Sequence, residues 1–250
     1  MRYTITSRQN PHIVDIFKLK QKKYRDEMGL VVLEGERIIR DALGQKIQPQ
    51  CMVVCEDDLT KFEYILKDLE CDVYVTSKSV FNTLSNTQNS QGLLAIVHFV
   101  PSPFAMPTQN FLVLDGVQDP GNMGTIIRTA VALGYATIYL YNCVDIRNDK
   151  VLRSTMGTIF KAKLIEVDID MLQQVASVAQ LIVADMHGTD LKDILLNGLF
   201  GIVLGSEANG VSDEVSRLAT HTVCIPMQNN VESLNVAVAG ALLMYGLKSE

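Results

Sequence analysis

The 250 residues suffice for one large domain or two smaller ones, and 48% hydrophobic with 20% charged residues is ordinary globular composition. No apolar run approaches the roughly 18 residues of a membrane span, and the start MRYTITSRQNPH lacks a signal-peptide core, so we expect a cytoplasmic protein without a membrane partner. Five scattered cysteines favour reduced thiols over a disulfide framework. The histidines lie far apart and far from any cysteine pair, so we expect no metal site.

The net charge of −6 is unevenly distributed along the chain. Residues 1–25 carry seven cations and one anion, a net +6, whereas the remainder carries 15 cations and 27 anions. Clustered Lys and Arg bind polyanions through counterion release, so this segment is a candidate polyanion-binding surface. Helical spacing places Lys18, Lys22 and Arg25 on one face. A solvated surface helix is the alternative interpretation.

Residues 1–100 are typical of a small α/β unit. Strands are expected in GLVVLEG, QCMVVCE, CDVYVTS and GLLAIVHFV, and they alternate with helical patterns at 36–43, 58–69 and 77–85. The following stretch holds three of the seven prolines within seven residues and has no charge. It predicts a linker over 101–110.

Residues 111–250 alternate more regularly. Strands are expected in FLVLDGV, ATIYLY, KLIEV, LIVADM, GIVLGSE and TVCIPM, with helices in TIIRTAVALG, around 149–157, near 170–179, from Ser212 and from about 232. Strands that are apolar along their whole length predict a mostly parallel sheet with helices on both faces. Ligands bind beyond the carboxyl ends of such strands, which directs attention to three loops.

The first loop is LDGVQDPGNMGTIIRTA, residues 114–130. Residues 119–122 have the composition of a turn, and a helix is expected from near Gly124, where exposed N–H groups suit an anion or a polar ligand. Arg128 then lies one turn into an apolar helix. A cation there predicts either an internal salt bridge, for instance to Glu207, or a functional group directed at the loop.

The second loop is LGSEANG, residues 204–210. Gly205 and Gly210 permit close backbone approach. Glu207 stands at a strand end, where a catalytic or ligand-binding carboxylate often lies; a solvated turn is the alternative. Neither of these loops has the glycine spacing of a dinucleotide-binding loop or a P-loop.

The third loop follows a strand that ends at Ile225-Pro226-Met227. The helix after it should have Ser233 and Asn235 as its inner polar residues. From Leu234 to Leu247 it is apolar nearly all round, with Gly240 permitting close packing. A helix without a polar face is buried on all sides, which at this place in the chain indicates a partner subunit.

Together the three loops resemble the signatures of the SpoU (TrmH-type) branch of the SPOUT RNA methyltransferases. The matching patterns are N-x-G-x-x-x-R-x-A at 122–130, G-x-E-x-x-G at 205–210, and I-P-M followed by S-L-N-V at 225–236. R-S-T-M-G at 153–157 is similar to the family's segment between the first two patterns. Residues 7–43 resemble the family's substrate-binding domain, which is related in fold to ribosomal protein L30e.

The resemblance implies an S-adenosylmethionine-dependent 2′-O-ribose methyltransferase that acts on structured RNA, rRNA before tRNA, and needs no metal. It implies an L30e-like domain over 1–100 and a catalytic domain over 111–250 with a trefoil-knotted sheet and a site shared across a homodimer. By position, the cofactor-binding residues would be Gly205, Ile225, Met227 and Leu234. The catalytic residues would be Asn122, Arg128, Glu207, Ser233 and Asn235. The RNA-binding residues would be Arg8, Lys18, Lys22, Lys23 and Arg25.

Three points stay open at the level of sequence. The family's usual proposal makes Arg128 the base, but a guanidinium rarely releases a proton, so a fork that grips phosphate is the easier role. Asn229 stands where many members have Gly, and Asn also tolerates a left-handed turn. A non-catalytic RNA-binding protein and a base-methylating enzyme are the alternatives; the first predicts loss of the catalytic side chains and the second other loop patterns.

Overall fold

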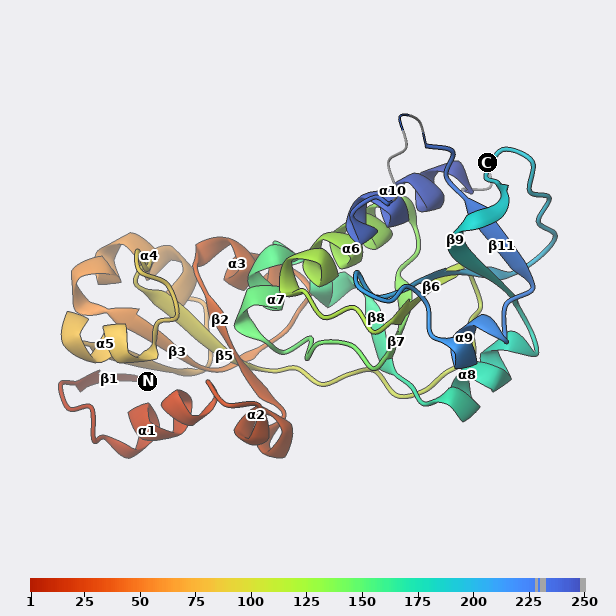
Figure 1. The fold of residues 1–250 in the computed structure, drawn as a ribbon. Helices are drawn as coiled ribbons and strands as arrows, with labels where there is room; N and C mark the ends of the chain where they lie inside the picture. Colours follow the sequence, from red (N-terminus) through yellow and green to blue (C-terminus); the bar gives the residue numbers. More distant parts are fainter. Residues whose placement is uncertain (228, 230–232, 248–250) are drawn as a thin grey trace. The chain divides into compact units, whose positions relative to one another are not determined.

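The computed structural model describes residues 1–227, 229 and 233–247, and it divides into two compact units, each with its own sheet (Figure 1). The first unit comprises residues 1–100 and 147–160, and the second comprises residues 101–146 and those from 161 onward. None of the described helices is long and apolar enough to cross a membrane.

The sheet of the first unit is mixed. Its described strands run in the order β1-β4-β3-β5-β2, with bounds β1 (Arg2–Ile5), β4 (Asp72–Thr76), β3 (Pro49–Cys55), β5 (Leu93–His98) and β2 (Leu30–Glu34). β1, β4 and β3 are parallel, whereas β5 pairs antiparallel with both β3 and β2. Almost every residue of β3 is buried, because side chains alternate between two covered faces.

Helices cover both faces of this sheet. The bounds are α1 (Pro11–Lys18), α2 (Lys22–Met28), α3 (Glu36–Gly44), the 3₁₀ turn η1 (Glu56–Asp58), α4 (Leu59–Leu66), α5 (Lys78–Leu84) and α7 (Asp149–Ser154). α1 and α5 contribute Ile13, Ile16 and Phe81 to one core with Val53 of β3. Burial raises the pKa of the Cys51 thiol in this core to about 12, so the thiol stays protonated.

The basic segment of the first unit differs from its expected form. α1 ends at Lys18 and α2 begins at Lys22, so Lys18 and Arg25 lie on different helices and share no helical face. Arg25 is buried, and its guanidinium donates to the backbone oxygens of Leu19 (3.0 Å) and Lys20 (2.9 Å). The burial of Arg25 gives no support to the RNA-binding role expected for it, because its guanidinium closes the turn between the two helices.

Residues 147–160 pack with the first unit, whereas the sequence analysis placed them in the catalytic domain. Arg147 is buried and forms an ion pair with Asp26 at 2.6 Å. α7 packs on β2, and a Cβ at Gly157 would lie 2.3 Å from a carboxylate oxygen of Asp41 in α3. Contacts between residues so far apart in sequence leave no local signal.

The sheet of the second unit is parallel throughout its described strands, which confirms the expected architecture. The order is β11-β9-β10-β6-β7-β8, with bounds β11 (His221–Cys224), β9 (Gln180–Asp190), β10 (Phe200–Leu204), β6 (Phe111–Asp115), β7 (Thr137–Tyr141) and β8 (Lys163–Glu166). The central strands β6 and β10 are buried along their whole length.

Helices lie on both faces of the parallel sheet (Figure 1). The bounds are α6 (Pro120–Leu133), α8 (Ile169–Ala176), α9 (Asp213–Ser216) and α10 (Val236–Gly246), with the 3₁₀ turn η2 (Thr158–Lys161) at the boundary between the units. α6 and α10 pack side by side, and α8 and α9 form a second pair. A Cβ at Gly240 would lie 2.6 Å from Leu204 of β10, so this glycine does permit close packing.

Two helices begin at other residues than expected. α6 starts at Pro120, because Asp119 is its N-cap and accepts a hydrogen bond from the Asn122 N–H at 2.8 Å. Arg128 consequently lies about two turns into the helix, not one. α10 starts at Val236 with Asn235 as its N-cap, and the expected start at 232 lies outside the described residues. The trefoil knot stays a prediction.

We predict that Gly201→Ala destabilises the second unit by about 1–3 kcal/mol, because the new Cβ would lie 2.2 Å from the ring of Phe111, which is fully buried. Urea denaturation measures the loss. In the double variant Gly201→Ala/Phe111→Leu the loss should be less than additive, since the smaller side chain makes room. Strict additivity would contradict the packing seen here.

Candidate active site

Three side chains from distant parts of the chain form one hydrogen-bonded row. Asn235 donates from Nδ2 to Oδ1 of Asn122 at 2.9 Å, and Asn122 donates from Nδ2 to Oε1 of Glu207 at 2.7 Å. These residues come from the N-cap of α10, the first turn of α6 and the loop after β10. The structure thus brings together three of the five expected catalytic residues.

The direction of this row follows from helix capping. Oδ1 of Asn235 accepts from the N–H groups of Ala237 (2.9 Å) and Val238 (3.3 Å), which leaves its Nδ2 to donate to Asn122. Asn122 must then present its oxygen to Asn235 and its Nδ2 to Glu207. Glu207 is therefore held as a hydrogen-bond acceptor.

The loop that carries Glu207 is closed by its own backbone. Ser206 and Gly210 exchange two hydrogen bonds, at 2.9 and 3.0 Å. A Cβ at Gly205 would lie 2.1 Å from the carbonyl carbon of Gly210, so a glycine is required at position 205. The buried carboxylate of Asp115, at the end of β6, accepts from the Ser212 N–H at 2.6 Å and ties the end of the loop to the sheet.

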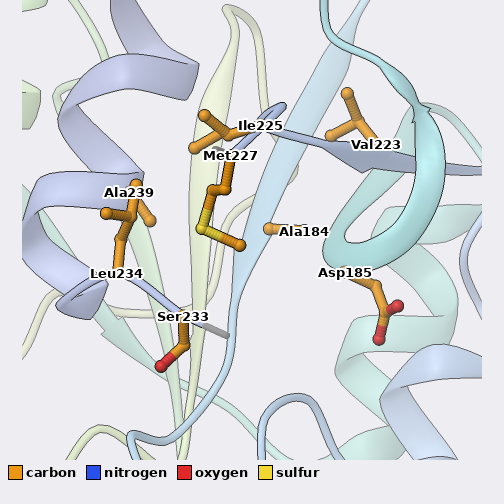
Figure 2. A pocket seen from close by; sticks show the side chains of 8 residues that line it. All are labelled: Ala184, Asp185, Val223, Ile225, Met227, Ser233, Leu234 and Ala239. Carbon is orange, nitrogen blue, oxygen red and sulfur yellow. The ribbon is translucent and has the colours of Figure 1, made fainter. Parts of the chain in front are cut away.

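An apolar hollow of about 240 Å³ lies beside this row, next to the middle of β9 and the carboxyl end of β11. It is lined by Ala184, Asp185, Val223, Ile225, Met227, Ser233, Leu234 and Ala239 (Figure 2). Figure 2 shows the Met227 side chain projecting into the middle of the hollow, between Leu234 and Ala184. Three of the four expected cofactor residues line it: Ile225, Met227 and Leu234.

A second hollow of about 400 Å³ adjoins the first and shares Ala184, Ser233, Leu234 and Ala239 with it. Gly205, the fourth expected cofactor residue, lines this second hollow together with Glu207 and Asn235. The two hollows therefore form one cleft with an apolar end and a polar end. The expected residues Ser233 and Leu234 lie at their junction.

β9 contributes two residues to this cleft that were not among the expected site residues. Ala184 and Asp185 follow the last residue of β9 that pairs regularly with β11, where the register shifts between Thr222 and Val223. The signal for these two residues in the sequence was their place directly after the apolar run Leu181-Ile182-Val183.

Arg128 is exposed on α6. The carboxylate of Glu207, which was expected as a possible salt-bridge partner of Arg128, accepts a hydrogen bond from Asn122.

Asn229 has a φ of 57°, which is the left-handed conformation that glycine would otherwise supply. The turn expected at Asn229 is therefore compatible with this side chain.

The N-terminal cations lie in the first unit and are largely paired. Lys18, Lys22 and Lys23 lie 2.8, 2.7 and 3.9 Å from Asp15, Asp26 and Glu27, all on the surface. Arg8 is exposed in the turn before α1. The ion pairs reduce the excess positive charge that the first 25 residues suggested, because two of the three carboxylates come immediately after that segment.

Two family models match the chain. Residues 109–245 match the SpoU rRNA Methylase family, and residues 10–95 match the MRM3-like substrate binding domain. The first match covers all residues of the row and the cleft. The second match falls within the first unit.

Proteins of known description are similar over nearly the whole chain. The 23S rRNA (guanosine(2553)-2′-O)-methyltransferase RlmP of Bacillus subtilis is 31% identical, over 98% of this chain and 98% of its own. The mitochondrial rRNA methyltransferase 3A of Danio rerio is 27% identical, over 90% of this chain and 65% of its own. The crystal structure of the AdoMet-bound rRNA methyltransferase from Sinorhizobium meliloti superposes with a TM-score of 0.86 at 28% identity, over 98% and 97% of the two chains.

We predict that Asn235→Asp and Asn235→Ala separate the two uses of this side chain. Ala removes the N-cap and should cost about 1 kcal/mol, whereas Asp keeps an acceptor for Ala237 and Val238 and should cost less in urea denaturation. Both variants remove the donor to Asn122, so amide hydrogen exchange in the 205–210 loop should accelerate in both. Unchanged exchange in Asn235→Asp would show that the row does not hold Glu207.

Proposed function

The chain belongs to the SpoU rRNA methylase family, and from this membership we propose that it methylates the 2′-oxygen of a ribose in rRNA, with S-adenosylmethionine as methyl donor. The observation that carries the proposal is the polar row of Asn235, Asn122 and Glu207 at one end of a cleft whose other end is apolar. Such a cleft can hold a sulfonium donor beside a ribose.

The cleft fits S-adenosylmethionine by the chemistry of its lining. Ile225, Met227 and Leu234 offer apolar contacts for an adenine and a thioether chain, and Ser233 offers a hydroxyl at the junction with the polar end. When bound, the cofactor supplies a methyl group on a positively charged sulfur. The chain's task is then to bring a ribose hydroxyl to that carbon.

Glu207 and Asn122 are the groups that can orient the ribose. The amide of Asn122 occupies one oxygen of Glu207, so the other oxygen of the carboxylate can accept a hydrogen bond from a sugar hydroxyl. The planar guanidinium fork of Arg128 is suited to grip a phosphate. We propose that Ser233 and Asn235 complete the catalytic set, as the family pattern implies.

The first unit supplies the proposed contacts with RNA outside the cleft. Arg8, Lys18, Lys22 and Lys23 are exposed cations there, and a phosphate could compete with the surface carboxylates that now pair with the three lysines. We propose a cytoplasmic location, where the five free thiols would stay reduced.

We further propose that the enzyme is a homodimer through α10. Val238, Leu242 and Tyr245 lie on one face of this helix and are 50%, 44% and 74% exposed. Such a row of large apolar side chains is typical of a protein contact. Leu243 and Leu247 are buried within the unit itself, so their apolar character is no evidence for a partner subunit.

The function is tested by mapping 2′-O-methyl positions in rRNA from cells with and without this gene. One or more positions should lose their methyl group in its absence and regain it when the purified protein and S-adenosylmethionine are added. Isothermal titration with S-adenosylhomocysteine in EDTA should also show binding. An unchanged methylation map, or binding heat only after zinc or magnesium is added, would contradict the proposal.

We predict that Arg128→Lys lowers the methylation rate by orders of magnitude while folding and S-adenosylhomocysteine affinity persist. Lys keeps the charge but not the bidentate fork, so a phosphate would be held less firmly and in no fixed orientation. Single-turnover methylation and thermal denaturation measure the two effects. A variant that methylates at nearly the wild-type rate would remove Arg128 from the catalytic set.

We predict that Leu242→Glu makes the protein monomeric, because it places a charge in a contact that excludes water. Sedimentation velocity at micromolar concentration measures the change. Val178→Glu is the matched control, since Val178 is 54% exposed in the same unit but lies outside α10. A wild-type protein that sediments as a monomer at this concentration would refute the dimer.

A further inference from the structure

A hollow in the first unit combines charge, hydrogen-bonding groups and apolar surface. It has a volume of about 260 Å³ and is formed by the start of α3, the loop over 85–92 and the segment over 153–157. Arg37, Arg153, Asn89, Gln91, Ile38 and Met156 are the side chains that matter in it. We propose that this hollow binds one unpaired nucleotide of the RNA, an inference that rests on the proposed function.

Arg37 is the side chain of this hollow whose hydrogen-bond donors are available to a ligand. It is exposed, and within the described part of the chain it makes no hydrogen bond or ion pair. Arg153, on the opposite lining segment, is tied to Asp149 at 2.6 Å. A phosphate or a base edge is the ligand that uses the planar donor fork of an uncommitted arginine best.

The amide of Gln91 is oriented by α3. Its Oε1 accepts from the Glu36 N–H at 2.8 Å, and a Cβ at Gly35 would lie 3.1 Å from this oxygen. Because the oxygen is committed to the helix, the Nε2 group is the part left to donate to a ligand. Asn89 adds a second exposed amide to the same rim. Donors and acceptors at fixed positions can read the edge of a base.

The carboxylate of Glu34 in this hollow is occupied by hydrogen bonds from the neighbouring loop. Glu34 accepts hydrogen bonds from Ser85 Oγ (2.6 Å), Thr87 Oγ1 (2.6 Å) and the Asn86 N–H (2.9 Å). Burial raises the pKa of Glu34, but these hydrogen bonds lower it more, so the group stays ionised and occupied. Its role is to fix the loop that carries Asn89.

The apolar part of the hollow lies on an unusual backbone. Met156 has a φ of 49° and a side chain that is 40% exposed, although such a conformation disfavours a bulky residue. Strained residues of this kind cluster at functional sites. With Ile38 it offers an apolar surface that a base can cover. The volume is below that of a drug-sized site, which suits one base and excludes a duplex.

Two variants test the site: one removes the proposed contact with a phosphate, and the other removes the proposed contact with a base. The probes are a hairpin RNA with an unpaired loop and the fully paired duplex of the same stem, titrated against the full-length protein without S-adenosylmethionine. Arg37→Ala should weaken hairpin binding about tenfold and lower the salt slope by roughly one phosphate contact. Met156→Gly keeps the left-handed backbone and removes only the side chain, so hairpin binding should weaken while the salt slope stays unchanged.

Duplex affinity should hardly change in either variant. Lys67→Ala, which removes an exposed cation at the end of α4 in the same unit, is the matched control and should leave hairpin affinity intact. Wild-type hairpin affinity in Arg37→Ala, or equal losses for hairpin and duplex, would overturn the proposal. These titrations need no turnover, so failure of the site is distinguishable from failure of the wild type to methylate rRNA.

Discussion

The hydrogen bonds at the start of α10 determine the polarity of the whole candidate active site. A carboxamide has one accepting and one donating end, and Asn235 uses its accepting end to cap the helix. Its donating end must then face Asn122, whose own donating end must face Glu207. If either carboxamide were turned round, two acceptors or two donors would face each other and a hydrogen bond would be lost. The free N–H groups at the start of α10 thus determine the orientation of the hydrogen bonds as far as Glu207, which lies in a loop 28 positions before Asn235.

The rest of the second unit holds these three groups in place by means that do not depend on the row itself. Asp119 caps α6 and sets the position of Asn122, while the glycine at 205 lets the 206–210 loop close on its own backbone. The parallel sheet brings the ends of β6 and β10 to one edge, because their carboxyl ends point the same way. Each side chain is therefore positioned by local backbone structure before it makes its long-range hydrogen bond. Such preorganisation is what orientation of a ribose hydroxyl requires.

Sequence predicted the parts of this arrangement that depend on local pattern and missed those that depend on tertiary contacts. Uninterrupted apolar runs gave the strands of the parallel sheet, as they should when both faces are covered. The starts of α6 and α10 were misplaced, because Asp, Pro and Asn favour turns and helix N-termini equally. Arg25 had the sequence context of a surface cation, and only the turn between α1 and α2 shows why it is buried. The row through Asn122 joins residues 85 and 113 positions apart, which no local periodicity can indicate.

The charge distribution shows why recognition of RNA by this protein should depend on a few short-range contacts. The protein is acidic overall, and Lys18 and Lys22 are engaged by Asp15 and Asp26 at the surface. Exposed pairs of this kind are weak, so a phosphate can replace the carboxylate, but the exchange returns little net energy. Long-range attraction is then small, and affinity must come from groups that gain a partner only when RNA binds. Among the residues that the structure describes, Arg37 has no partner. Such an arginine gains more from a phosphate than a lysine that must first release a carboxylate, which makes Arg37 a better anchor than the more conspicuous basic helices.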